Sequence, residues 1–335
     1  MIEIIGMLAA LFAGLLAESF MPDNSDNDDA SEDDDSLGES GTIVDDPGFV
    51  LVDDDIGMPI SNDTIVGPDD DQTLIGGADA DVLFGDGGDD LVYGGDGNDQ
   101  LGGRAGNDRL LGGFDEDQLI GGDGNDSLDG GADDDSLYGE NGEDTLIGAS
   151  GDDVLYAGAG NDTLTGDAGQ DHLFGGEGSD TLTASEGNDM LEGGLGEDLL
   201  SGGAGTDEIY GDAGNDTLWG NADGSADSEV DFLNGGAGND TLILGTGDYG
   251  HGGDGADSFT VTELGLGTTA VEITDFDPAE DQLVLLYDPA LSTPPTASLQ
   301  TDVSGNTQVL LDGQVVATLT NGGSISLGDI VLRAA

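Results

Sequence analysis

The sequence predicts an all-β repeat protein, and two strictly periodic positions support this prediction. Residues 76–219 divide without a gap into sixteen units of nine residues. Position 6 of every unit is Asp, and position 8 is Leu in fourteen units and Val92 or Ile209 in the other two. A nine-residue period matches neither the 3.6-residue period of a helix nor the two-residue alternation of a strand. It therefore indicates a supersecondary unit that is stacked along the chain, as in a solenoid.

The composition excludes several classes of protein. The 335 residues include 74 Asp and Glu but only three Arg and no Lys, which gives a net charge of −71, and there is no Cys. Nucleic-acid binding relies on clustered Lys and Arg, so no nucleic-acid partner is expected. Disulfides and cysteine zinc sites are excluded as well. A charge of this size disfavours any compact state unless cations neutralise it.

The region before the repeats has two parts. Residues 1–20 contain an apolar run, Ile4–Ala17, whose fourteen residues fall short of the roughly 20 that span a bilayer. The sequence leaves three interpretations of this run open: a signal peptide, a membrane anchor or a short interaction helix. Residues 21–57 are predicted to be an acidic linker that is mostly disordered, with short strands at Thr42–Val44 and Phe49–Val52.

The repeat array is predicted to extend over residues 58–260. It begins with two degenerate units that are typical of capping repeats, 58–66 and 67–75. After Trp219 it continues with a repeat that carries a six-residue insertion (220–234), two further units (235–243 and 252–260) and a degenerate stretch between them (244–251).

Residues 261–335 are predicted to form a small β domain that abuts the array. Glycine becomes less frequent there, and apolar residues alternate with polar ones. The expected strands are Ala270–Phe276, Gln282–Leu286, Gln308–Leu311, Gln314–Leu319 and Ile325–Leu332.

The chemistry of one unit, Gly-Gly-x-Gly-x-Asp-x-Leu-x, points to a metal. Glycines at positions 1, 2 and 4 permit positive φ, so that a tight turn can aim backbone carbonyls at one point. The Asp at position 6 adds a carboxylate, and positions 7–9 remain as a three-residue strand with position 8 pointing inward. Hard oxygen ligands in a flexible geometry suit Ca²⁺ better than Mg²⁺, Zn²⁺ or Cu²⁺. Several Ca²⁺ ions are therefore the predicted cofactor.

The predicted ligands repeat with the unit. The carboxylate ligands are Asp81, Asp90, Asp99, Asp108, Asp117, Asp126, Asp135, Asp144, Asp153, Asp162, Asp171, Asp180, Asp189, Asp198, Asp207, Asp216, Asp240 and Asp257. The carbonyl ligands, named from the clearest units, are Gly94, Gly95, Gly97, Gly121, Gly122, Gly124, Gly175, Gly176, Gly178, Gly202, Gly203 and Gly205.

This motif resembles the RTX, or haemolysin-type, calcium-binding nonapeptide repeat over residues 58–260. The resemblance implies a right-handed parallel β-roll with two nonapeptides per turn and with each ion between loops two repeats apart. Asp81 would then share a site with Asp99, and Asp90 with Asp108. Sixteen units would make eight turns and about fourteen regular sites at most. Because a core of one aliphatic residue per unit is too small to order the array, we expect it to fold only when calcium binds.

The resemblance also implies a route of export. Proteins of this family leave Gram-negative cells unfolded through type I secretion machinery, guided by an uncleaved C-terminal signal. Residues Val271–Leu286 resemble the segment that follows the repeats in serralysin-type C-terminal domains. Residues Ile325–Leu332 resemble the apolar terminal signal, although Arg333 and two alanines extend beyond it. A secreted or cell-surface location is therefore expected.

The expected function is that of a non-catalytic surface, matrix or adhesion component. The alternative is a secreted calcium-dependent enzyme or a cytolysin remnant. Neither H-E-x-x-H nor G-x-S-x-G occurs, and a cytolysin of this family would need a long apolar region and acylated lysines. The G-x-G-x-x-G match at Gly245–Gly250 is followed by another repeat rather than a helix, so it predicts no dinucleotide site. His251 is interpreted as a distorted turn at an aliphatic position, and His172 as an outward residue without a function.

Position 9 presents Ile120, Tyr138, Tyr156 and Phe174 in successive turns if alternate repeats lie on opposite sheets. The other sheet would present Thr165, Thr183 and Ser201. Ordinary β-propensity explains such residues at an outward position. The alternative is an adhesive stripe for self-association or for a cell-surface partner.

Overall fold

The computed structural model describes residues 50–51, 64–67, 70–221, 229–262, 269–288, 294–320 and 325–335. The chain divides into two units, residues 1–38 and 39–335, and every described residue belongs to the second. The predicted apolar segment, the predicted strand Thr42–Val44 and nearly all of the acidic linker lie outside the described residues. Within the predicted strand Phe49–Val52, residues Val50–Leu51 form strand β1.

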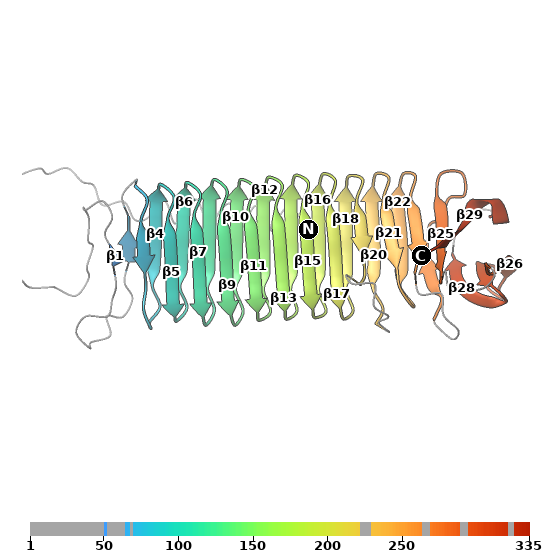
Figure 1. The fold of residues 1–335 in the computed structure, drawn as a ribbon, viewed down its shortest axis with the longest axis horizontal. Helices are drawn as coiled ribbons and strands as arrows, with labels where there is room; N and C mark the ends of the chain where they lie inside the picture. Colours follow the sequence, from blue (N-terminus) through green and yellow to red (C-terminus); the bar gives the residue numbers. More distant parts are fainter. Residues whose placement is uncertain are drawn as a thin grey trace, which may run out of the picture. The chain divides into compact units, whose positions relative to one another are not determined.

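The described strands form two long sheets, between which the chain of the array alternates (Figure 1). Sheet A contains, in spatial order, β1 (Val50–Leu51), β3 (Thr73–Ile75), β5 (Leu91–Asp96), β7 (Arg109–Phe114), β9 (Ser127–Ala132), β11 (Thr145–Ser150), β13 (Thr163–Ala168), β15 (Thr181–Glu186), β17 (Leu199–Ala204), β19 (Thr217–Trp219), β21 (Thr241–Leu244), β23 (Ser258–Val261), β25 (Gln282–Tyr287) and β29 (Ile330–Ala334).

Sheet B contains, in spatial order, β2 (Thr64–Val66), β4 (Val82–Gly87), β6 (Gln100–Ala105), β8 (Gln118–Asp123), β10 (Ser136–Asn141), β12 (Val154–Ala159), β14 (His172–Glu177), β16 (Met190–Leu195), β18 (Glu208–Ala213), β20 (Phe232–Ala237), β22 (Tyr249–Asp254), β24 (Val271–Ile273), β28 (Gln314–Leu319), β27 (Thr307–Leu311) and β26 (Ala297–Thr301).

The pairing within the array is parallel and keeps the repeat in register. Leu137 of β10, for example, pairs with Leu155 of β12 and with Leu119 of β8. Two nine-residue units therefore make one turn, and the predicted all-β parallel β-roll is confirmed. Among the described residues the only helical element is a 3₁₀ turn at Leu327–Asp329, and no helix there could cross a membrane.

The strands are longer than the sequence predicted. A typical strand of the array has six residues, at positions 7, 8, 9, 1, 2 and 3, rather than the expected three. In β10 and β12 the pairing continues past Tyr138 and Tyr156 to Asn141 and Ala159. The residue at position 2 has a positive φ in both strands, Glu140 (φ 76°) in β10 and Gly158 (φ 115°) in β12, and this bend lets the strand continue.

The core of the roll is a single file of aliphatic side chains at position 8. These residues, from Leu83 to Leu242, are each at most 2% exposed. Position 1 is also buried, so two residues of each strand, at positions 8 and 1, face the interior. The roll therefore has a narrow apolar centre, which matches the expectation of one inward aliphatic residue per unit.

The stretch 244–251 contains the start of a strand rather than a loop alone. Gly250 pairs with the inward Leu233 and therefore occupies an inward position, whereas His251 pairs with the outward Asn234. The prediction that His251 replaces an aliphatic residue is therefore wrong. A methyl group built on Gly250 would lie 3.0 Å from a δ-carbon of Leu244, which is fully buried and occupies this part of the core.

The C-terminal region continues both sheets. Strands β24 and β25 pair in parallel with the last strands of the array, β22 and β23, and β28 and β29 pair in parallel with β24 and β25. Strands β26, β27 and β28 then form an antiparallel end to sheet B. Each of the five predicted strands contains or overlaps an observed one, but β26 was not predicted. The 3₁₀ turn interrupts the predicted strand Ile325–Leu332.

Candidate metal centre

The Asp residues at position 6 line up in two rows, one in the loops that lead from sheet A to sheet B and one in the loops that lead back. The main-chain N–H of each Asp donates to Oδ1 of the next Asp in its row over 2.7–3.2 Å. The first row contains Asp81, Asp99, Asp117, Asp135, Asp153, Asp171, Asp189, Asp207, Asp231 and Asp248. The second row contains Asp90, Asp108, Asp126, Asp144, Asp162, Asp180, Asp198, Asp216, Asp240, Asp257 and Asp281.

All eighteen predicted Asp residues thus lie in these rows, and each is at most 6% exposed. Asp81 neighbours Asp99, and Asp90 neighbours Asp108, which are the pairs that the resemblance assigns to shared sites. In most of the predicted residues the second carboxylate oxygen, Oδ2, is buried and accepts no hydrogen bond from any described residue. These residues are Asp90, Asp99, Asp108, Asp117, Asp126, Asp135, Asp144, Asp153, Asp162, Asp171, Asp180, Asp189, Asp198, Asp216 and Asp240.

In the units whose position 1 is Gly, this oxygen lies beside the α-carbon of that glycine. A methyl group built on Gly211 would lie 2.6 Å both from Oδ2 of Asp216 and from the carbonyl oxygen of Gly235 in the next turn. The same construction on Gly193 gives 2.6 Å to Oδ2 of Asp198 and 2.9 Å to the carbonyl of Gly211. A carboxylate oxygen and a carbonyl oxygen therefore share one small space, which absence of a side chain keeps open.

This arrangement corrects the role assigned to the glycines. Positive φ occurs at positions 2 and 4, for example at Gly122 (φ 122°) and Gly124 (φ 137°), but not at position 1 glycines such as Gly121. Position 1 instead provides room for the carboxylate. Two units carry Ala157 and Ala184 at this position, both fully buried, so a methyl group can be accommodated there.

The predicted carbonyl ligands differ in what they face. The position-1 carbonyl of Gly94 lies beside Gly76, together with the carboxylate of Asp81. The position-2 carbonyls of Gly95 and Gly176 face the position-2 α-carbons of the following turns. Likewise, each position-4 carbonyl faces the position-4 α-carbon of the following turn. Position-1 carbonyls therefore lie beside Oδ2 of the carboxylates, whereas a methyl group built on Gly142 or Gly187 would meet both the position-4 carbonyl of the preceding turn and Oδ1 of the position-6 Asp.

Burial makes the ionised form of these carboxylates costly. Burial, together with the neighbouring carboxylates of Asp117 and Asp153, raises the pKa of Asp135 to about 8, although the hydrogen bond from Asp117 N–H lowers it. The pKa of Asp99 is raised to about 7 for the same reasons. Buried carboxylates at this spacing remain ionised only if a cation offsets their charge. Arg104 pairs with the half-buried Asp86 instead.

The donors fit Ca²⁺. No three acidic or histidine side chains of the described residues converge on one point, so the oxygens at each position come from carboxylates and backbone carbonyls together. Calcium takes six to eight oxygen ligands of this mixed kind and tolerates irregular geometry. Residues at positions 1 and 6 of successive turns would hold such an ion.

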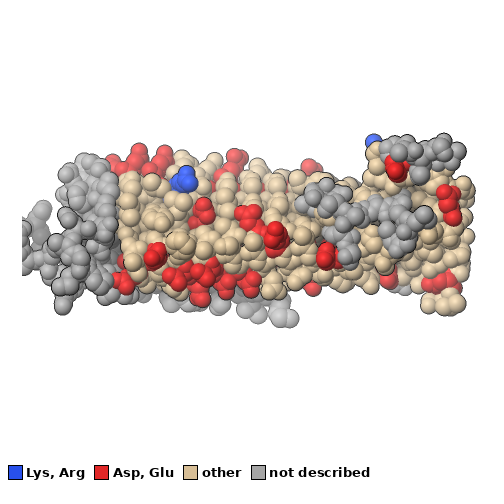
Figure 2. Space-filling view, turned by 60° about the horizontal axis from the view of Figure 1, so that its bottom comes forward, with Lys and Arg blue, Asp and Glu red and all other residues tan. Residues whose placement is uncertain are grey.

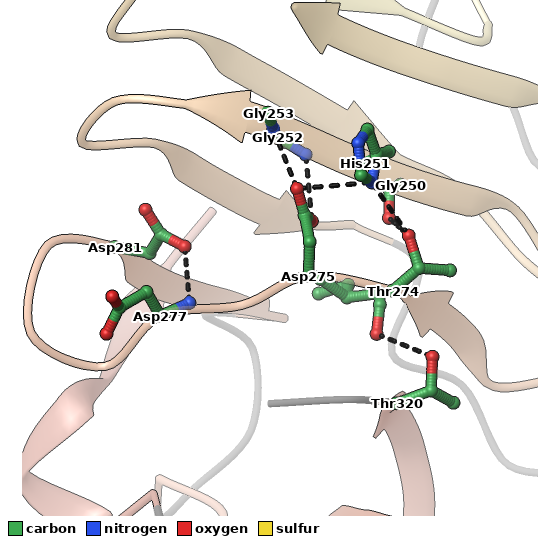
Figure 3. Close-up of polar contacts among 10 residues, drawn as sticks. Gly250, His251, Gly252, Gly253, Thr274, Asp275, Asp277, Asp281 and Thr320 are labelled. Atoms are coloured by element: carbon green, nitrogen blue, oxygen red, sulfur yellow. Dashed lines mark hydrogen bonds and ion pairs between the residues drawn. The ribbon is translucent and has the colours of Figure 1, made fainter. Parts of the chain in front are cut away.

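The rows end differently from their interiors. Oδ2 of Asp248 accepts a hydrogen bond from Gly245 N–H (2.6 Å), and Oδ2 of Asp281 accepts one from Asp277 N–H (2.7 Å; Figure 3). At the start of the first row, Oδ2 of Asp81 accepts one from Gly77 N–H (3.0 Å). Main-chain donors therefore satisfy Oδ2 at three of the four row ends, and these three positions depend less on a cation, whereas Oδ2 of Asp90, at the start of the second row, has no donor among the described residues.

A further carboxylate caps the last repeat. Asp275 accepts hydrogen bonds from the N–H groups of Gly252 (3.0 Å) and Gly253 (2.7 Å), and its Oδ2 lies 3.1 Å from Nδ1 of His251 (Figure 3). In the array, the strand of the next turn supplies the acceptors for such amides, as when Gly203 N–H donates to the carbonyl of Gly220. Asp275 supplies acceptors instead where the pairing of β22 with β24 stops at Ile273.

Three members of the rows were missed by the sequence prediction: Asp231, Asp248 and Asp281. Asp231 and Asp281 are each followed two residues later by Leu, which is the signal that marks position 6 elsewhere. Both stand 24 residues after the preceding member of their row instead of 18. Asp248 is followed by Tyr and Gly, so only the pairing of β22 identifies it.

Comparison with known proteins agrees with this geometry. The model of a family described as RTX calcium-binding nonapeptide repeat matches residues 67–101, 102–137, 138–173, 165–200, 192–224 and 225–250. These matches cover more than half of the chain. No curated protein matches the sequence.

Proposed function

Because the chain belongs to the family of RTX calcium-binding nonapeptide repeat proteins, we propose that it is a secreted, non-catalytic protein whose roll folds on binding extracellular calcium. The observation that carries this proposal is the buried Oδ2 atom that recurs without a donor along both Asp rows. Without a cation, folding would bring these carboxylates together unneutralised. The free energy of calcium binding is then also the free energy that stabilises the fold.

The number of ions follows from the repeat. Sixteen regular units, with each ion between turns that are adjacent in one row, would hold about fourteen ions at most. The carboxylates at the row ends, Asp248 and Asp281, already have two main-chain donors and would contribute least.

Calcium-dependent folding suits export. Weak calcium sites stay empty at cytosolic calcium concentrations, so the chain would remain unfolded inside the cell and pass through type I secretion machinery. It would fold in the calcium-rich surroundings of a Gram-negative cell. There it would act as a surface, matrix or adhesion component.

Circular dichroism of the full chain during a calcium titration tests the folding part of the proposal. We expect a coil spectrum in chelator and a cooperative gain of strand signal with calcium; full strand signal in chelator would contradict the proposal. Incubation of the calcium-loaded chain with erythrocytes, casein, a lipid ester and polysaccharides tests the non-catalytic part. Lysis or hydrolysis in any of these assays would contradict it.

A further inference from the structure

The outward surface of sheet B contains a row of stacked aromatic rings. The rings of Tyr138 and Tyr156 lie 5.4 Å apart and those of Tyr156 and Phe174 lie 4.5 Å apart, with planes 8° from parallel in both pairs. Ile120 precedes them in the same register. These residues come from β8, β10, β12 and β14, which follow one another along the roll (Figure 1). The position-9 side chains that the sequence placed in successive turns are therefore in contact.

Positions 7 and 9 beside this row carry no acidic side chain, although Asp123, Glu140 and Glu177 are exposed at positions 2 and 3 of the same strands. The outward residues at positions 7 and 9 from β8 to the start of β16 define what we call the aromatic face: Gln118, Ile120, Ser136, Tyr138, Val154, Tyr156, His172, Phe174 and Met190. Glu192 ends it on one side. Sheet A also lacks acidic side chains at positions 7 and 9 from β11 to β23, so the ring stack is what distinguishes the aromatic face. Elsewhere on the roll, acidic side chains are spread over the surface, as on the face shown in Figure 2.

Sheet A differs at the equivalent positions. There position 9 contains Ile147, Thr165 and Thr183, which lie side by side in β11, β13 and β15. β-Propensity alone would place aromatic and β-branched residues on both sheets alike. The restriction of the ring stack to sheet B therefore points to a role for this one surface.

The aromatic face is preorganised for binding. Each ring is half-buried between its neighbours, so little side-chain entropy remains to be lost when a ligand binds. Neither Tyr138 nor Tyr156 uses its hydroxyl in a hydrogen bond with a described residue. These hydroxyls, with Gln118, Ser136 and His172, provide polar donors and acceptors beside apolar surface, a combination that favours amphipathic ligands.

Charge decides between the classes of partner. An acidic polymer would be repelled by the whole chain, and a basic partner would be attracted to the acidic surface elsewhere. A second copy carries the same charge, and nine residues per side fall short of the roughly 20–30 of a stable protein interface. We propose that the aromatic face binds a neutral polysaccharide, whose repeated hydroxyls and apolar ring faces match a repeated row of rings and polar groups.

The test uses the full chain in calcium, with dextran and cellulose as neutral probes and dextran sulfate as the charged counterpart of dextran. We expect binding to at least one neutral probe and weaker binding to dextran sulfate. The triple variant Tyr138→Ser, Tyr156→Ser and Phe174→Ser should lose about tenfold or more in affinity. The matched control on sheet A, Ile147→Ser, Thr165→Ser and Thr183→Ser, should bind like the parent chain.

The circular dichroism spectrum in calcium separates this inference from the proposed function on which it rests. If the parent chain does not fold in calcium, the proposed function fails. If it folds but binds neither neutral probe, or if the sheet B variant binds as well as the sheet A control, the inference is overturned. Equal binding of dextran sulfate, or a concentration-dependent dimer that the sheet B variant abolishes without any binding of the neutral probes, would overturn it as well.

Discussion

The main-chain N–H of Asp117 donates to Oδ1 of Asp135 in the next turn over 2.7 Å, while Oδ2 of Asp135 is buried without a donor among the described residues. One oxygen of the carboxylate thus fixes the stacking of two turns, and the other is available to a cation. The same relationship recurs along both rows. It explains why Asp, with two oxygens on a short side chain, occupies position 6 in every regular unit.

The first prediction concerns Asp135 itself. Asparagine keeps an oxygen that can accept the Asp117 N–H but removes the negative charge. Asp135→Asn should therefore lower the calcium stoichiometry by about one or two ions and raise the calcium midpoint of folding severalfold. Calorimetric titration and circular dichroism measure these two effects. Asp96→Asn, at an exposed position 3, is the control and should change neither. Equal behaviour of the two variants would show that charge at position 6 is not used for calcium.

The second prediction concerns pH in the absence of metal. Burial, followed by neighbouring carboxylates, raises the pKa of Asp126 and Asp171 to about 7 and that of Asp135 to about 8, from 3.8. The folded chain then binds more protons than the unfolded chain between about pH 4 and pH 8, so stability falls as pH rises through this window. Acidification from pH 8 to pH 5 without metal should increase the strand signal in circular dichroism. A signal that stays constant or decreases would contradict the burial of ionised carboxylates.

The third prediction concerns glycine at position 4. Gly142 has a φ of 147°, and a methyl group there would collide with the carbonyl of Gly124 in the preceding turn. Gly142→Ala should destabilise the calcium-loaded roll by about 1–3 kcal/mol, as thermal unfolding in calcium would show. Gly77 has no positive φ, and nothing lies within 4 Å of a methyl group built there. Gly77→Ala should have little effect, and equal melting temperatures for both variants would contradict the stacking of position 4.

The fourth prediction concerns the apolar centre. Leu155 is fully buried, whereas Leu195 is 57% exposed. Leu155→Ala should cost about 2–5 kcal/mol of stability in saturating calcium, and Leu195→Ala less than about 0.5 kcal/mol. Denaturant unfolding in calcium compares them. A small loss for Leu155→Ala would mean that the single file of aliphatic residues contributes little once the ions are bound.

The sequence predicted the parts of the fold that repeat without interruption. The spacing of Asp81, Asp90 and their successors located both rows, and the spacing of Leu83 and its successors located the core. Both depend on nearest-neighbour stacking, so every unit repeats the same local geometry. The pairing registers of β20 and β22 could not be predicted in this way, because the turns before these strands differ in length from the regular repeat.

Other features needed coordinates because they depend on contacts between turns. The sequence predicted that glycine at position 1 supplies flexibility to the turn. In the structure it leaves space beside Oδ2 of the Asp in its own unit, and the carbonyl of a position-1 glycine in the next turn, such as Gly235, borders the same space. Asp275 accepts the N–H groups of Gly252 and Gly253 where the array meets the C-terminal strands, and its sequence context resembles that of other acidic residues in this chain. Strand β26 forms only because β27 offers it an antiparallel edge.

Amide hydrogen exchange of the full chain, in calcium and after calcium removal, tests most directly whether calcium holds the two Asp rows together. In calcium we predict slow exchange at the amides of Asp117 and Asp135, which donate along the first row, and at Leu137 and Leu155 in the strands beside it. In excess EDTA at neutral pH we predict fast exchange at all of them. Protection that persists in EDTA, or that is absent in saturating calcium, would contradict the account.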